Sequence, residues 1–175
     1  MSKGASDLTT PVGPKDHAQG RSDASITLVE YGDYECPYCG MAYPIVKRLQ
    51  AKLGAHLRFV FRNFPLEEVH PHATAAAELA EAAALQGQFW EMHDTLYEHQ
   101  NALQPADLQR YAEKLGLDLD ALADALRGGA PLKRVGADLE SGVRSGVSGT
   151  PTFFINGRRF EGDWRDEKEF ALAMS

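Results

Sequence analysis

The 175-residue sequence lacks the features that mark several specialised classes of protein. It has no run of about 18 apolar residues, so it predicts no membrane-spanning helix. Its first 25 residues contain no apolar segment of the kind that a secretory signal needs, so we expect a cytoplasmic protein, or a periplasmic or extracytoplasmic one if a leader was removed. The 18 basic residues are scattered and outnumbered by 25 acidic ones, which argues against nucleic acid as a partner.

Cysteine is scarce as well. The chain has two, Cys36 and Cys39, separated by Pro37 and Tyr38. Two cysteines exclude a disulfide scaffold and reduce the functional question to the role of one CxxC pair. The remaining composition, with 43% hydrophobic and 25% charged residues, suits a soluble globular chain with a packed core.

The order of the expected elements favours an α/β fold. Residues 1–24 are rich in glycine, proline, serine and charge, and we expect a polar N-terminal arm there, before a single domain at 25–175. This domain begins with a strand buried on both faces at 25–31. A helix that carries the CxxC pair and ends near Leu53 follows, and then a second strand at 56–62. These elements form a βαβ unit.

In the rest of the domain we expect a series of helices, followed by a β-hairpin. Apolar residues recur at helical spacing, between glycine and proline breaks, over about 71–145. Asn156-Gly157 is a type I′ turn sequence and predicts a β-hairpin over 152–160, before a short helix at 166–174. The sequence therefore predicts a helical insertion between the βαβ half and a C-terminal β-hairpin plus helix.

The position of Cys36 suits a nucleophile. It falls where a strand turns into a helix, so free backbone N–H groups and the helix dipole should stabilise its thiolate, and it alone should face solvent. Cys39 lies about one helical turn later, close enough to attack a mixed disulfide formed at Cys36. Pro37 lacks an N–H and stiffens the first turn. The ring closed by this disulfide is too small to restrict the unfolded chain, which argues against a structural role.

Two other interpretations of the pair remain open. The CxxC could be half of a zinc site, with His70 and His72 as the clustered candidates for the missing ligands. The two cysteines could also be inert core residues. Redox chemistry is favoured over both, since structural zinc pairs more often have other spacings, and we expect no metal and no other cofactor.

Two further positions gain meaning beside the cysteines. Glu30 interrupts an apolar strand. It is either a structural carboxylate, paired or at the sheet edge, or a buried acid with a raised pKa that handles the proton of Cys39. Thr150-Pro151 directly precedes a strand. The proline either marks the start of that strand or forms a cis-proline turn beside the cysteines.

Together these residues resemble a known family. Cys36-Pro-Tyr-Cys39 after an apolar strand, with Val147-Ser-Gly-Thr-Pro-Thr-Phe-Phe154 far downstream, resembles the DsbA-like thiol–disulfide oxidoreductases of the thioredoxin superfamily. The stretches 61–66, 70–72 and 86–94 are also similar to this group.

The resemblance implies a thioredoxin-like fold with a helical insertion and thiol–disulfide oxidoreductase activity. It assigns attack to Cys36, resolution to Cys39, the cis-proline turn to Thr150-Pro151 and the acid under the active site to Glu30. Strong oxidants of this family carry histidine where Tyr38 stands, so the resemblance does not imply strong oxidising power.

We therefore expect an enzyme that exchanges disulfides with protein or peptide thiols and is recycled by a redox partner. Within the same chemistry, it could be a reductase or isomerase fed by a thioredoxin-like partner. In a different class, it could be a non-catalytic zinc-binding or redox-gated interaction module. Gly149, Thr150 and Pro151 are expected to pair with an extended client backbone, and Pro37 and Tyr38 to tune the loop between the cysteines.

Overall fold

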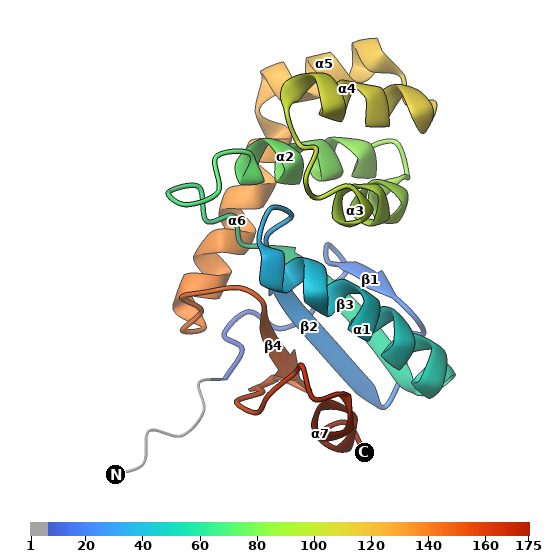
Figure 1. The fold of residues 1–175 in the computed structure, drawn as a ribbon, viewed down its shortest axis with the longest axis vertical. Coiled ribbons are helices and arrows are strands. Elements are labelled where there is room, and N and C mark those ends of the chain that lie inside the picture. Colours follow the sequence, from blue (N-terminus) through green and yellow to red (C-terminus); the bar gives the residue numbers. More distant parts are fainter. Residues whose placement is uncertain (1–6) are drawn as a thin grey trace.

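The computed structural model describes residues 7–175, which are built around a five-stranded sheet (Figure 1). Its order is β1-β3-β2-β4-β5, from β1 (His17–Gln19), β2 (Ile26–Gly32), β3 (Leu57–Asn63), β4 (Thr152–Ile155) and β5 (Arg158–Arg159). β2 and β3 are parallel, whereas the other neighbouring pairs are antiparallel. β2 is therefore the central strand, and the two outer strands are short.

Helix α1 (Pro37–Leu53) makes the crossover between the two parallel strands. Pro37 begins the helix, where its missing N–H costs no hydrogen bond. Gly54 ends it with a φ of 51°, a conformation that glycine adopts without strain. The predicted βαβ unit is confirmed, and each strand lies within one residue of its expected bounds.

The predicted helical insertion is also confirmed. It consists of α2 (Ala73–Ala84), α3 (Phe89–Glu98), α4 (Pro105–Lys114), α5 (Leu119–Gly128) and α6 (Ala130–Arg144). Figure 1 shows α2 to α5 stacked beyond one end of the sheet, while α6 returns along it. Among residues 7–175, no helix combines the length and the hydrophobicity of a membrane span.

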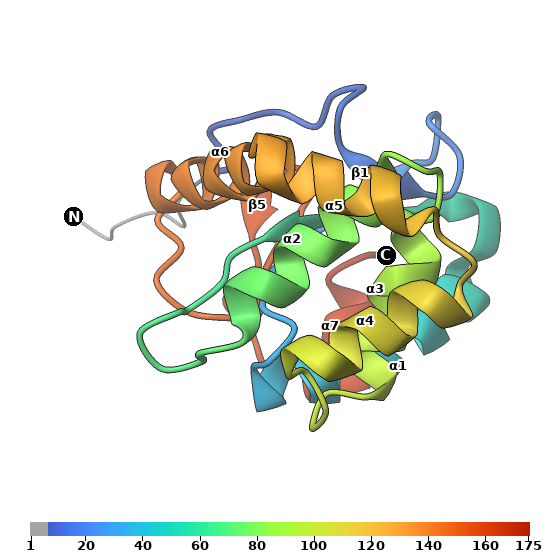
Figure 2. The same cartoon turned by 90° about the horizontal axis from the view of Figure 1, so that it is seen from above.

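The sheet is covered on both faces, and Figure 2 shows α6 on one side of it and α1 on the other. Side chains alternate along a strand, so successive residues of β2 point to different faces. Glu30, with Phe61 and Phe153 beside it on the neighbouring strands, points to the face covered by α1. Tyr31 and Phe154 point to the face covered by α6. We call these the α1 face and the α6 face.

β4 and β5 form the predicted hairpin. Asn156 and Gly157 have φ values of 49° and 82°, and a type I′ turn requires positive φ at both positions. The last helix, α7 (Glu167–Leu172), follows Asp166, whose carboxylate accepts hydrogen bonds from two backbone N–H groups of the first turn. α7 packs on the α1 face, where Phe170 is fully buried.

The polar segment before residue 25 is partly built into the sheet. β1 pairs with β3, and Asp7 bridges to Arg158 beside the opposite edge. Leu8 and Val12 pack on the apolar residues of the α6 face. The sequence predicts only an arm here because a three-residue strand is too short to show an alternating pattern. Residues 1–6 of the expected arm lie outside the described residues.

Candidate active site

The candidate site lies where α1 begins, beside the start of β4. Cys36 is the residue that precedes the first helical turn, and its Sγ lies 3.5 Å from the carbonyl oxygen of Thr150. The peptide bond between Thr150 and Pro151 is cis. The structure therefore brings together two motifs that are 114 residues apart in the sequence.

The surroundings of Cys36 favour its thiolate. Its pKa is lowered to about 5, first by a hydrogen bond from the Cys39 thiol and further by the Thr150 side chain and the backbone N–H groups of Cys39 and Tyr38, although burial opposes this shift. No acidic residue lies in the first turn of α1. The hydroxyl of Thr150 is buried without a partner among residues 7–175, so it can donate to an ionised sulfur.

Cys39 has the opposite character. Burial, the hydrogen bond to Cys36 and the negative charge of Glu30 raise its pKa well above the ordinary value. The backbone N–H of Asp33 lies 3.5 Å from its Sγ. The pair thus combines an acidic thiol with a weakly acidic one. Their exposure differs less than the sequence predicts, because Cys36 retains only 4% of its surface and Cys39 none.

Glu30 lies on the α1 face, as part of the central strand. It is 2% exposed, and its Oε1 has no hydrogen-bond partner among residues 7–175. Burial, followed by the nearby charge of Cys36, raises its pKa to about 8. β2 is not an edge strand, and among residues 7–175 no cation forms an ion pair with the carboxyl group, so Glu30 is neither at the sheet edge nor ion-paired.

Asp33 fixes the turn that leads from β2 to the cysteines. Its carboxylate accepts hydrogen bonds from the backbone N–H groups of Glu35 and Leu66, and it contacts Nδ1 of His70 at 2.8 Å. His72 contributes its backbone N–H to the Glu35 carboxylate. Among residues 7–175, no group of three or more His, Cys, Asp or Glu side chains could hold a metal ion, so the zinc interpretation has no ligand set there.

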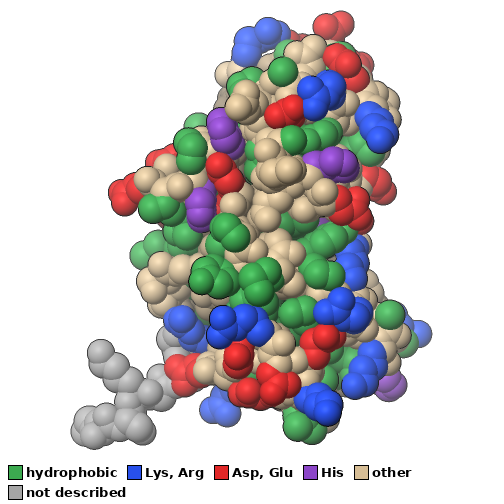
Figure 3. Space-filling view, viewed as in Figure 1, with side chains coloured by type: hydrophobic (Ala, Val, Ile, Leu, Met, Phe, Trp, Pro, Cys, Tyr) green, Lys and Arg blue, Asp and Glu red, His purple; other side chains and the backbone are tan. Residues whose placement is uncertain are grey.

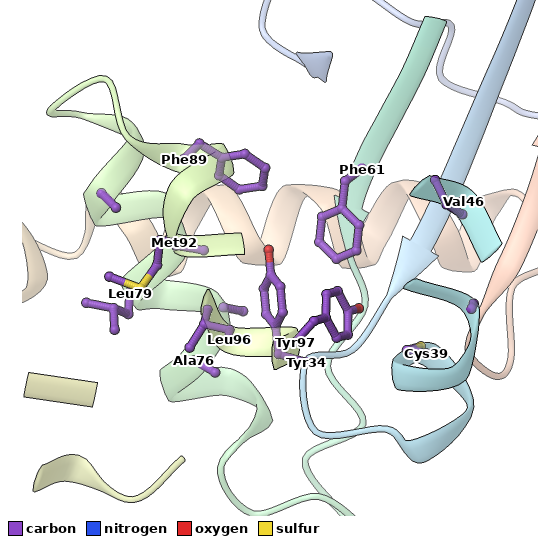
Figure 4. Close-up of a cluster of buried hydrophobic side chains, with 14 of the residues drawn as sticks. Tyr34, Cys39, Val46, Phe61, Ala76, Leu79, Phe89, Met92, Leu96 and Tyr97 are labelled. Atoms are coloured by element: carbon purple, nitrogen blue, oxygen red, sulfur yellow. The ribbon is translucent and has the colours of Figure 1, made fainter. Parts of the chain in front are cut away.

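Aromatic side chains lie beside Cys39, next to the insertion. Figure 4 shows Tyr34 and Tyr97 between Cys39 and the buried residues of α2 and α3. The hydroxyl of Tyr34 is hydrogen-bonded to Nδ1 of His93 at 2.9 Å, and burial holds the pKa of His93 well below its usual value, so this imidazole is neutral. No local pattern in the sequence marks these residues, because the contact joins positions 59 residues apart. Asp33 could have been noticed as a polar residue directly after a buried strand.

The remaining predicted site residues surround Cys36. Pro37 begins α1. Tyr38, which follows it, is 54% exposed, and Met41 is 50% exposed. Figure 3 shows apolar side chains across the middle of the surface on this side of the molecule. The carbonyl of Gly149 accepts a hydrogen bond from the hydroxyl of Thr152 at 2.7 Å.

Comparison with known proteins identifies the family. Residues 13–171 match the family model described as thioredoxin. The chain belongs to the thioredoxin family. The thioredoxin-family fold seen here is similar to oxidised BdbD from Bacillus subtilis, with a TM-score of 0.82 and 22% identity over 98% of this chain and 96% of that one. It is also similar to alpha-DsbA1 from Wolbachia pipientis, with a TM-score of 0.79 and 21% identity over 95% and 92% of the two chains.

The curated relatives of this thioredoxin-family chain are longer. A Salinispora tropica protein named Na(+)/H(+) antiporter NhaA 3 is 51% identical over 175 residues, which make up 99% of this chain and 27% of the relative. The chain spans about a quarter of the length of the curated relatives it matches. The similarity thus concerns one segment of those proteins.

Proposed function

We propose that the chain is a thiol–disulfide oxidoreductase that exchanges disulfides with protein or peptide thiols. The observation that carries this proposal is the contrast between the two thiols at the start of α1. The pKa of Cys36 is lowered to about 5, whereas that of Cys39 is raised well above the ordinary value. A low pKa makes Cys36 both a thiolate at neutral pH and a good leaving group from a mixed disulfide.

In the oxidising direction, a client thiolate attacks Sγ of Cys36 in the Cys36–Cys39 disulfide. A bond forms between the client sulfur and Cys36, and the Cys36–Cys39 bond breaks, so that Cys39 leaves with the electron pair and must take up a proton. A second client thiolate then attacks the client sulfur of the mixed disulfide. This step oxidises the client, and Cys36 leaves as a stable thiolate.

Glu30 supplies the proton that Cys39 takes up. Its raised pKa of about 8 leaves the carboxyl group protonated at neutral pH. In its ionised form it raises the pKa of Cys39, so the two groups interact. In the reverse direction the carboxylate accepts the proton from Cys39 before this sulfur attacks the mixed disulfide. This is general acid–base catalysis by a buried group.

The client backbone is proposed to lie along Thr150 and Pro151. The carbonyl oxygen of Thr150 lies 3.5 Å from Sγ of Cys36, so a chain held there would place its sulfur next to the attacking atom. The exposed side chains of Tyr38 and Met41 flank this position on α1. Gly149 precedes this position, and its carbonyl, which already accepts a hydrogen bond from the hydroxyl of Thr152, keeps one lone pair for a client N–H.

The low pKa of Cys36 favours the oxidising direction, since stabilising the reduced form makes the disulfide a stronger oxidant. A reductase or isomerase fed by a thioredoxin-like partner uses the same residues. The equilibrium constant with glutathione separates these roles. A potential well above that of the glutathione pool supports the oxidase, and a potential below it supports the reductase.

The decisive experiment is the capture of mixed disulfides. Cys39→Ala should accumulate a covalent complex with a peptide that carries one disulfide, because Cys36 attacks and nothing resolves the product. Cys36→Ala is the matched control and should capture nothing. Equal capture by both variants, or by neither, would contradict the assigned roles.

A second candidate concerns the clients. The curated relatives are named Na(+)/H(+) antiporters and are about four times as long as the matching segment. We propose that the cysteines served by this domain include those of a membrane-embedded transporter, attached to it or associated with it. Cys39→Ala should then capture partners mainly from solubilised membranes. Capture confined to the soluble fraction would contradict this proposal.

A further inference from the structure

Gln100 connects the helical insertion to the cysteine turn. It lies in the turn after α3, and its side-chain Nε2 donates to the carbonyl oxygens of Tyr34 at 3.1 Å and Cys36 at 2.5 Å. These two carbonyls lie at the start and the end of the short turn Tyr34–Cys36, which directly precedes α1. The same side chain therefore holds both ends of the turn that presents the attacking sulfur.

The side-chain amide of Gln100 can reach the Cys36 carbonyl because residue 40 is a glycine. A Cβ atom at this position would lie 2.2 Å from Oε1 of Gln100, so any other residue here would displace the amide. The backbone N–H of Gly40 also donates to the Cys36 carbonyl at 3.1 Å, which means that this oxygen accepts from both residues. The obstacle is the far end of a flexible side chain, so an added methyl group should expel Gln100 without disturbing the helix.

The turn that carries Gln100 is itself anchored to the insertion. The hydroxyl of Tyr111, on α4, donates to the carbonyl oxygen of Ala102 at 2.6 Å, and the ring of His99 packs on that of Tyr111 with centroids 5.3 Å apart. The backbone N–H of Ala102 in turn donates to the His99 carbonyl. The insertion therefore determines where the amide of Gln100 lies.

We propose that Gln100 is a positioning residue, which uses the space left by Gly40 to hold the Tyr34–Cys36 turn in the geometry that makes Cys36 reactive. The amide fixes the first carbonyl of α1, and the N–H groups of Tyr38 and Cys39 that face the sulfur belong to the same turn. Without the amide this turn has more freedom, and the N–H groups stabilise the thiolate less. The inference rests on the proposed function of the cysteines and gives the insertion a part in it.

The test compares Gln100→Ala, Gly40→Ala and the double variant with the wild type. The first readout is the pH dependence of Cys36 alkylation in the reduced protein, and the second is the redox equilibrium with glutathione. We expect each single variant to move the alkylation midpoint upward and to change the redox equilibrium constant about tenfold toward the disulfide, a fall of about 30 mV in potential. The double variant should match the singles, since both remove the same contact.

Two variants serve as matched controls. Gln86→Ala removes a glutamine whose amide also pairs with backbone, at Asp118, but within the insertion. Gly136→Ala adds a methyl group to a helical glycine of α6 with no atom within 4 Å. Both should leave the midpoint and the potential unchanged. Gln100→Glu keeps the size of the side chain but replaces the donor with an acceptor, so it should behave like Gln100→Ala.

The outcomes separate the two proposals. Wild-type values in Gln100→Ala and Gly40→Ala, or equal shifts in the controls, would overturn the role of Gln100. Wild-type behaviour of Gln100→Glu would show that only packing matters and would overturn it too. If the wild type itself fails to exchange disulfides, the proposed function is wrong, whereas the alkylation profiles still decide whether Gln100 positions Cys36.

Discussion

The two faces of the sheet differ in whether a buried carboxyl group has a charged partner. On the α6 side, Asp16 forms an ion pair with Arg62 at 2.9 Å, and both side chains are buried. Arg62 also donates to the hydroxyl of Tyr31. On the α1 face, Glu30 is buried more deeply than Asp16, yet its Oε1 has no partner among residues 7–175.

The contrast also appears in the pKa values. Burial acts against both carboxyl groups, but for Asp16 the hydrogen bonds and charge of Arg62 outweigh it and hold the pKa below its ordinary value. For Glu30 nothing opposes burial, and the pKa rises to about 8. A paired buried acid is suited to holding elements together, whereas an unpaired one is suited to moving a proton.

The largest effect should come from breaking the pair on the α6 side. Arg62→Met removes the main partner of Asp16 and leaves it only the N–H of Gly13 at 2.9 Å and the more distant Arg134 at 4.0 Å, so it should reduce the free energy of unfolding by about 3 kcal/mol. Denaturant unfolding measures this loss. The double variant Asp16→Asn/Arg62→Met should recover part of it, and a double variant as unstable as the single one would show that the pair matters only through packing.

Replacing the titratable carboxyl group of Glu30 should increase the free energy of unfolding instead of reducing it. The folded protein keeps this carboxyl protonated up to a pKa of about 8, whereas the unfolded chain releases the proton above about 4.5, so wild-type stability falls as pH rises between these values. Glu30→Gln is neutral throughout and should be more stable than the wild type by roughly 3 kcal/mol at pH 7.

The same variant should lose activity while it gains stability. Exchange at Cys39 should slow by about a hundredfold, because a glutamine cannot transfer the proton. Unfolding curves and single-turnover rates measured between pH 5 and 8 test both effects. Parallel stability profiles for the variant and the wild type would show that Glu30 has an ordinary pKa.

The redox state should change stability by a smaller amount. Because the pKa of Cys36 is lowered to about 5 in the folded protein, the thiolate stabilises the reduced form, fully above the ordinary thiol pKa near 9 and no longer below pH 5. At pH 7 this contribution is roughly 2 to 3 kcal/mol, so the reduced protein should melt roughly 5 to 10 °C above the oxidised one. An oxidised form that melts higher at every pH would assign the disulfide a structural role.

The smallest effect on the free energy of unfolding is expected from two matched variants, each of which removes one tyrosine hydroxyl. The hydroxyl of Tyr31, on the α6 face, pairs with Ser141 and Arg62, and Tyr31→Phe should cost about 1 to 2 kcal/mol. The hydroxyl of Tyr97 lies on the α1 side and has no partner among residues 7–175, so Tyr97→Phe should change the free energy of unfolding by less than about 0.5 kcal/mol. Equal losses would mean that the two sides do not differ as described.

The sequence predicts the fold well where local patterns are strong. The βαβ unit follows from two apolar strands and the glycine that ends α1, and the hairpin follows from Asn156-Gly157. β1 was missed because it has three residues and is stabilised by its neighbour β3 instead of by its own composition. Tertiary pairing decides such a strand.

In the candidate active site, too, the sequence predicts the features that depend on local patterns and not those that depend on tertiary contacts. The spacing of Cys36 and Cys39 predicts a redox pair, and the position of Glu30 in an apolar strand leaves open a structural carboxylate and a buried acid that handles a proton. The contacts of Asp33 with Leu66 and of Gln100 with Cys36 join segments that are 33 and 64 residues apart, and no local pattern in the sequence marks them. The low exposure of Cys36 was also missed, because it depends on how β4 packs against the start of α1.

The outer strands of the sheet limit one route of aggregation, which is the growth of a sheet by the addition of strands. β1 and β5 have three and two residues, against seven in each of the strands β2 and β3. An extended chain that joins either edge finds a template too short for a stable ladder. Copies of the protein should therefore not assemble edge to edge.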